Sequence, residues 1–138
     1  MTTVQLEKLN IPPKPVNFLG SVPEWIVLVT LERLGKREGI DFTYQSPLLG
    51  GRLQKGGSVI DFEFIIPPDL AINVQGAFYH HESGTPIQQD DIQTRTTLLG
   101  FGVRLIFIDE NHVLEEPTFY VREALAYRDH SRLGAGGR

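Results

Sequence analysis

The sequence predicts an α/β fold in which helices flank a central mixed sheet, with the order helix, three strands, helix, strand, helix (αβββαβ). Two apolar-rich runs on either side of Pro67-Pro68 predict a strand hairpin. Stretches with helical spacing of apolar residues precede and follow it, and the short apolar run 103–108 is typical of a strand buried on both faces.

The chain divides into three predicted parts. Residues 1–20 contain Pro12, Pro13 and Pro15 without sustained periodicity, which predicts an extended N-terminal arm lying across its own domain or a neighbouring subunit. Residues 21–128 form one domain. Residues 129–138 end in Gly-Ala-Gly-Gly-Arg, and we expect a flexible tail.

The first helix of the domain has a clear start signal. Ser21-Val-Pro-Glu24 matches a capping box, with Ser at the N-cap and Glu three residues later. The helix is predicted to run to about Leu34 and to stop at Gly35. Glu24 is therefore interpreted first as a cap, which does not prevent it from serving a site as well.

Residues 41–45, DFTYQ, alternate as a strand, and a glycine-rich loop follows at 48–58. The loop contains Arg52 and Lys55, and such a loop can bring backbone amides and two cations to a phosphate. The alternative is a plain connection whose cations are solvated. The GxxxxGK[ST] pattern of nucleoside-triphosphate sites is absent from the sequence.

The hairpin comprises strands at 59–66 and 70–76. A turn centred on Pro68 would place Asp61 opposite Gln75 and Glu63 opposite Asn73. These four polar side chains would then share one face of the sheet, because side chains alternate along a strand.

Polar groups on central strands need an explanation, because burying them unpaired costs free energy. One explanation is a face that is open to solvent. The other is a metal site: the Asp61 carboxylate, a neutral oxygen ligand such as that of Gln75, and the nearby imidazole of His80 suit Mg²⁺. The sequence alone leaves both open.

A second helix is predicted from Ile87 to about Gly100, with Ile92 and Leu99 facing the core. Asp91 and Arg95 stand at i and i+4, which supports a helix. The strand 103–108 ends at Asp109-Glu110-Asn111, and a last helix begins at Pro117.

The composition narrows the function classes. With 138 residues and 41% hydrophobic residues, the chain can build one ordinary core, and it has no cysteine for a disulfide or thiolate site. No apolar run approaches 20 residues, so we expect a cytoplasmic protein with no membrane association. The net charge of −4 argues against tight, charge-driven nucleic-acid binding.

The hairpin motif resembles the PD-(D/E)XK nuclease superfamily, most nearly the very-short-patch-repair endonucleases and related single-domain proteins. The resemblance rests on Asp61 in the first hairpin strand, Asn73-Val74-Gln75 in the second, and the following Gly76-Ala77-Phe78-Tyr79-His80. It covers residues 21–127 and implies a restriction-endonuclease-like core. Most of that superfamily has an acid at the position of Asn73 and a Lys at the position of Gln75, both of which the repair endonucleases lack.

The resemblance implies a metal-dependent endonuclease that hydrolyses DNA phosphodiester bonds. Asp61 would hold Mg²⁺, with a second oxygen from Gln75 or from the Val74 carbonyl. Glu63 would assist through water, and Glu24 would be the extra acid of the first helix. His80 would act as general acid or base. Arg52, Lys55 and Arg95 would bind the substrate phosphate and stabilise its developing charge.

Two alternatives belong to other classes. In one, the nuclease fold persists without its chemistry as a structural or interaction component of a larger assembly such as a phage particle, which would place the protein in a virion. The N-terminal arm would then mediate homo-oligomer or assembly contacts. In the other, the protein binds DNA without cleaving it.

Overall fold

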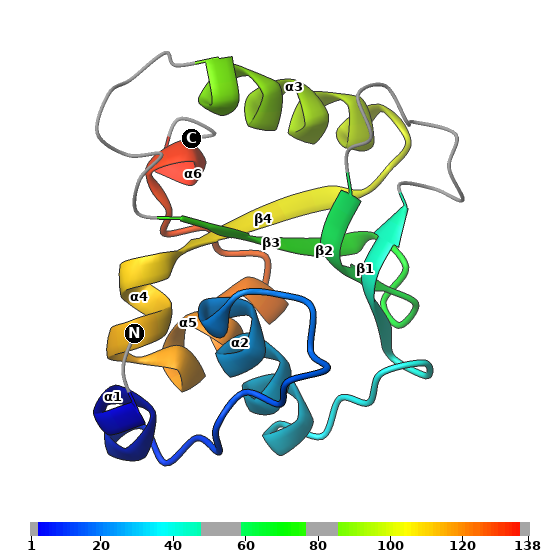
Figure 1. Cartoon of the computed structure of the whole chain (residues 1–138). Helices are drawn as coiled ribbons and strands as arrows, with labels where there is room; N and C mark the ends of the chain where they lie inside the picture. Colours follow the sequence, from blue (N-terminus) through cyan, green and yellow to red (C-terminus); the bar gives the residue numbers. More distant parts are fainter. Residues whose placement is uncertain (1–2, 48–58, 77–85, 136–138) are drawn as a thin grey trace.

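A four-stranded mixed sheet separates two layers of helices in the computed structural model, which describes residues 3–47, 59–76 and 86–135 (Figure 1). The strands are β1 (Phe42–Pro47), β2 (Val59–Phe64), β3 (Leu70–Gln75) and β4 (Arg104–Asp109). The helices are α1 (Thr3–Lys8), α2 (Val22–Arg33), α3 (Pro86–Gly100), α4 (Glu110–Glu115), α5 (Pro117–Leu125) and α6 (Arg132–Ala135). The predicted α/β class, with helices flanking a mixed sheet, is confirmed.

The strands lie in the order β1-β2-β3-β4. β1, β2 and β3 are antiparallel neighbours, whereas β3 and β4 pair in parallel, because α3 carries the chain back to the starting end of the sheet. The sequence predicted this order of elements but not α1, α4 or α6, which have 6, 6 and 4 residues and are too short for a periodic pattern. Helix α1 lies inside the stretch that was expected to be wholly extended.

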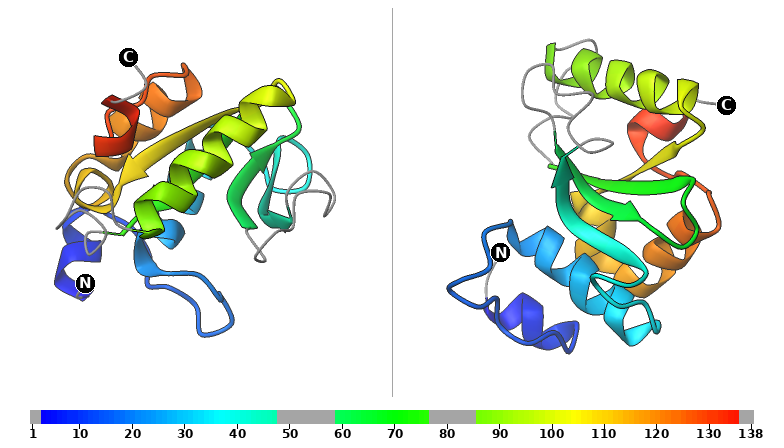
Figure 2. Two further views of the ribbon diagram at one scale, coloured as in Figure 1. Left: turned by 90° about the horizontal axis from the view of Figure 1, so that it is seen from above. Right: turned by 90° about the vertical axis from the view of Figure 1, so that its right-hand side faces the viewer.

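Each face of the sheet has its own apolar cluster. Helices α2 and α5 pack on one face, and α3 covers the other, as the two views of Figure 2 show. Strand β4 contributes to both, with Ile106 and Ile108 in the first cluster and Leu105 and Phe107 in the second. Burial on both faces explains why residues 103–108 are a continuous apolar run.

The predicted capping box is present at the start of α2. The backbone N–H of Glu24 donates to the Ser21 hydroxyl at 3.2 Å, and that hydroxyl lies 3.0 Å from the Glu24 carboxylate. The helix ends at Arg33, and Gly35 adopts a φ of +89°, which favours glycine. Both ends of α2 were therefore readable from the sequence.

The predicted hairpin register is wrong by two residues. Phe62 pairs with Ile72 and Glu63 with Ala71, so the hairpin centres on Pro67 rather than Pro68. The reason is tertiary: the N–H groups of Ile65 and Ile66 both donate to the carbonyl of Asp41, which holds the end of β2 against the start of β1. Because the error is an even number of residues, it does not by itself exchange the two faces of the strands.

The predicted orientation of α3 is also wrong. Leu98 is buried, whereas Leu99 is 60% exposed and Ile92 is 40% exposed. Asp91 and Arg95 share the inward-facing side with Leu98, since residues at i, i+4 and i+7 lie along one stripe of a helix. The helix therefore turns two polar side chains toward the sheet. Within the described residues, no helix is long and apolar enough to cross a membrane.

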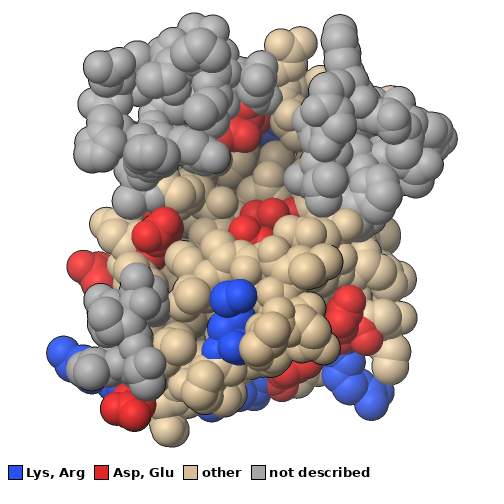
Figure 3. Space-filling model, in the orientation of Figure 1, with Lys and Arg blue, Asp and Glu red and all other residues tan. Residues whose placement is uncertain are grey.

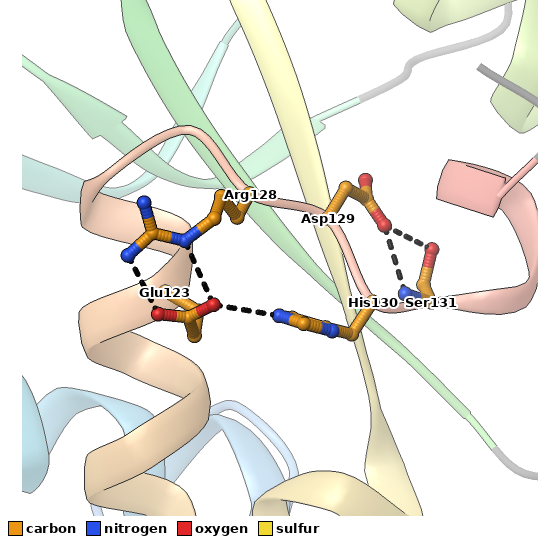
Figure 4. Close-up of polar contacts among 5 residues, drawn as sticks. All are labelled: Glu123, Arg128, Asp129, His130 and Ser131. Atoms are coloured by element: carbon orange, nitrogen blue, oxygen red, sulfur yellow. Dashed lines mark hydrogen bonds and ion pairs between the residues drawn. The ribbon is translucent and has the colours of Figure 1, made fainter. Parts of the chain in front are cut away.

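The start of the expected flexible tail is fastened to the sheet instead. One Asp129 carboxylate oxygen accepts the backbone N–H of Phe107 in β4 at 2.8 Å, and the other accepts the N–H of Ser131 at 2.9 Å and its hydroxyl (Figure 4). The N–H of Gly134 donates to the Ser131 hydroxyl at 2.8 Å. A side-chain carbon on Gly134 would lie 1.7 Å from Asp129, so only glycine fits. We call this arrangement the Asp129 clasp.

Replacing Asp129 by Ala should lower the free energy of unfolding by about 1–3 kcal/mol, because the Phe107 and Ser131 donors would lose their acceptor. Urea denaturation measures this change. Glu115→Gln is the control, since Glu115 is an exposed acid at the end of α4. An equal or larger loss in the control variant would contradict a structural role for the clasp.

Candidate active site

The candidate site lies where β2 and β3 stop pairing through their backbones. The backbone N–H of Asp61 donates to the side-chain oxygen of Asn73, and the N–H of Val74 donates to the carboxylate of Asp61, both at 2.8 Å. Side chains thus take the place of the backbone acceptors in two hydrogen bonds between β2 and β3. Strand β2 twists at this point: Ile60 packs in the cluster under α3, whereas Phe62, two residues later, packs in the cluster under α2. A carboxylate and an amide are consequently inserted between neighbouring strands.

Gln75 lies at the end of β3, beside α3. Its side chain is buried, and its amide nitrogen donates to the Asp91 carboxylate at 2.7 Å. Among the described residues, its amide oxygen has no hydrogen-bond partner. A buried oxygen of this kind is unusual, because most buried polar atoms are paired. It is suited to accept a ligand that the chain does not itself supply.

Glu24 approaches from the first turn of α2. Its carboxylate accepts the hydroxyl of Tyr44 and, at 3.3 Å, the side-chain amide of Gln45, both on β1. The preceding Gly20 backbone is so close that a side-chain carbon there would lie 1.8 Å from the Tyr44 hydroxyl. Glu24 therefore both caps its helix and fastens that helix to the sheet.

The pKa of Asp61 is raised from 3.8 to about 7. Burial is the largest cause, the negative charge of Glu24 adds to it, and Asp91 contributes less; the hydrogen bond from Val74 acts in the opposite direction. Burial and the bond to Glu24 likewise raise the pKa of Tyr44. Acids of two other elements, α2 and α3, thus act electrostatically on Asp61 of β2.

Crowded carboxylates can be stabilised by a proton or by a cation. Oxygen donors are the ligands that Mg²⁺ prefers, and Asp61 with the oxygen of Gln75 provides one charged and one neutral donor. The described residues contain no cluster of three His, Cys, Asp or Glu side chains arranged to hold a metal ion. A metal here would therefore be held by few protein ligands, as Mg²⁺ commonly is.

The structure brings Asp61, Gln75 and Glu24 into one neighbourhood. Glu63 lies two positions farther along β2, opposite Ala71. Arg95 is directed elsewhere, since it donates to the carbonyl of Leu133 at 2.8 Å and lies over the ring of Phe107. The predicted residues Arg52, Lys55 and His80 lie outside the described residues, as does the rest of the Ala77–His80 motif.

Two contributors were not predicted from the sequence. The sequence shows Tyr44 only as one of the alternating residues of the strand 41–45, and it shows Asn73 only as a polar residue of the hairpin motif without a role of its own. Tyr44 could not have been found locally, because its partner Glu24 is 20 residues away. The signals for Asn73 were its place among the polar residues of the hairpin and in the Asn73-Val74-Gln75 motif.

The Asp61 carboxyl should titrate with a midpoint near pH 7, which carbon NMR of the side chain can measure. The sign for stability follows from linkage: the folded state holds this proton more tightly than the unfolded state. The stabilisation of the folded state by the protonated Asp61 carboxyl is therefore complete below about pH 3.8 and is lost as the pH rises through about 7. Asp61→Asn should remove this decline in the free energy of unfolding, which urea denaturation at several pH values measures. An unchanged pH profile would refute the assignment of the raised pKa to Asp61.

Glu24→Gln should lower the pKa of Asp61, because it removes a neighbouring negative charge. Gln also satisfies a capping box, so α2 should remain intact. The matched control is Glu32→Gln, an exposed acid two turns farther along α2. The same NMR titration distinguishes them: equal shifts in both variants would mean that the effect is one of net charge and not of proximity.

No family model, curated protein or solved structure matches this chain. The function proposed below is therefore based on the residues and geometry of the site.

Proposed function

We propose that this protein is a metal-dependent endonuclease that hydrolyses DNA phosphodiester bonds at the Asp61 site. The observation that carries the proposal is the insertion of Asp61 between β2 and β3, where it is buried under the influence of two other acids, Glu24 and Asp91. One of these acids, Asp91, also holds Gln75, whose amide oxygen has no hydrogen-bond partner among the described residues. A buried acid with a strongly raised pKa, placed among such groups, is typical of a functional site.

The arrangement of elements supports the same proposal. Three antiparallel strands followed by a helix and a parallel fourth strand give the αβββαβ order of a restriction-endonuclease-like core, and we propose that the chain has that core. In the superfamily it resembles, the acid of the first hairpin strand and the residues at Asn73 and Gln75 belong to the active site. Asp61 and Asn73 are hydrogen-bonded at the break in the hairpin, and Gln75, two residues farther along β3, is bonded to Asp91, which supports this proposal.

The two departures from the superfamily motif have specific consequences. Asn73 accepts the backbone N–H of Asp61, so it would position the catalytic carboxylate and not bind the metal. Gln75 would be the neutral metal ligand, because Asp91 holds its amide nitrogen and leaves the oxygen available. Asp91 would thus act by orienting Gln75.

The chemistry can be divided among the residues. Mg²⁺ bound by Asp61 and Gln75 would polarise the phosphate and lower the pKa of a bound water. Glu24, tied to Tyr44, would accept a proton from attacking water close to the metal. His80 stays the sequence-based prediction for the acid that protonates the leaving oxygen.

Affinity for DNA would depend on the metal. Acidic side chains show in the recessed middle of the face in Figure 3, and most of the Lys and Arg side chains visible there lie below it. With a net charge of −4, the protein gains little from phosphate neutralisation by its own cations. A divalent ion would offset the carboxylates.

A second candidate is a structural protein that keeps this fold without cleavage. The observation in its favour is the N-terminal segment, where Val16 is fully exposed and Leu19 is 89% exposed. Phe18 between them is packed on Trp25 and Tyr44, so these two apolar side chains are presented on an anchored segment. Such a segment suits contact with another subunit or a larger assembly.

The deciding experiment is calorimetric titration of Mg²⁺ and Mn²⁺ followed by plasmid nicking with the same ions. We expect binding and nicking by the wild-type protein. Asp61→Asn should lose more than about 100-fold in nicking rate, because a metal ligand matters at least as much as the groups that orient one. Glu32→Gln is the control and should retain activity.

Two results would contradict the proposal. Nicking by Asp61→Asn at the wild-type rate would exclude this site. Absence of both metal binding and nicking in a folded wild-type protein would favour the structural candidate.

A further inference from the structure

A cavity of about 380 Å³ lies apart from Asp61, between the second half of α3, the start of β4 and the segment that follows α5. Its apolar lining includes Val103 and Leu105, both buried, and Leu99, which is 60% exposed. Two arginines, Arg95 and Arg104, also line it. The volume lies within the range of small-molecule sites, about 300–1,000 Å³.

Arg104 is held in position by a stacked ring. Its guanidinium lies 5.2 Å from the centre of the Tyr127 ring. The Tyr127 hydroxyl donates to the Asp69 carboxylate at 2.5 Å, and the carbonyl of Asp69 accepts the backbone N–H of Arg104 at 2.8 Å. One residue of the hairpin turn therefore fixes both partners of the stack.

Arg95 is fixed independently. One of its N–H groups donates to the carbonyl of Leu133 at 2.8 Å, and its guanidinium lies 5.7 Å from the centre of the Phe107 ring. A guanidinium carries five N–H donors, so this bond leaves capacity for an anion. Both cations are consequently pre-positioned, which reduces the entropy lost when a ligand binds.

Asp129, the acidic residue among the described residues of the lining, already has its hydrogen bonds. Asp129 belongs to the clasp described above and accepts from Phe107 and Ser131. It is therefore committed to the fold. The Thr96 and Tyr127 hydroxyls are committed as well, since they donate to Ile92 and Asp69, which leaves the two arginines with side-chain donors for a ligand. The cavity combines an apolar wall with two positioned cations.

We propose that this cavity binds a small amphipathic organic anion. A carboxylate or phosphate head would lie against Arg95 and Arg104, since guanidinium groups recognise both with paired hydrogen bonds. A short apolar body would cover Val103, Leu105 and Leu99. The proposal is independent of the nuclease activity, because none of these residues belongs to the Asp61 site.

The test is an amide NMR titration of the full chain with sodium hexanoate, hexyl phosphate, 1-hexanol and inorganic phosphate. We expect saturable shifts at Leu99, Val103 and Gly134 with the two amphipathic anions, at least about tenfold tighter than with hexanol. The anion with the lower Kd identifies the preferred head group. If hexanol or inorganic phosphate bound as tightly as the two amphipathic anions, the proposal would be overturned.

Arg104→Gln is the variant of choice, because Arg104 is exposed and its loss leaves the core untouched. It should weaken binding of the preferred anion by about tenfold or more. Arg122→Gln removes the same charge from an exposed position on α5 and should bind as the wild type does. Equal affinities in the two variants would show that the cavity does not use Arg104, and the proposal would fail.

Discussion

The exchange of hydrogen bonds between Asp61 and the opposite strand is the constraint on which the site depends. A regular hairpin would join β2 and β3 through their backbones and turn Asp61 away from its neighbours. Here the side chain of Asn73 takes the Asp61 N–H, and the carboxylate of Asp61 takes the Val74 N–H. The backbone groups remain satisfied while the strands admit an acid between them.

This insertion carries an electrostatic cost that the fold does not remove. Asp61 is buried and feels the charges of Glu24 and Asp91, yet the hydrogen bond it receives from Val74 only partly offsets them. A protein selected for stability alone would replace such an acid by Asn, since strained or destabilised groups are kept where they serve a function. The surrounding contacts hold the acids in place: Tyr44 holds Glu24, and Gln75 holds Asp91.

Helix α3 connects the two regions of interest because Asp91 and Arg95 lie on its inward side. Asp91 reaches Gln75 at the end of β3, and Arg95, one turn later, reaches Phe107 and Leu133. Leu98 then closes the core. The Asp129 clasp matters for the same reason, because it brings the chain after α5 against β4, where it completes the wall of the cavity. Packing and site formation thus share the same residues.

The sequence by itself determined the features that depend on neighbouring residues. The Ser21–Glu24 capping box, the hairpin around Pro67-Pro68 and the buried strand 104–109 are local patterns, and each appears in the structure. Alternation also grouped Asp61, Asn73 and Gln75 as the polar residues of the hairpin, but the insertion of Asp61 and Asn73 between the strands was not predictable from it. The tertiary structure alone decided the register, the inward side of α3 and the clasp. Each depends on a contact between distant residues, such as Asp41 with Ile65, Gln75 with Asp91, and Phe107 with Asp129, and no local pattern encodes which of several acceptors a backbone or side-chain donor will meet.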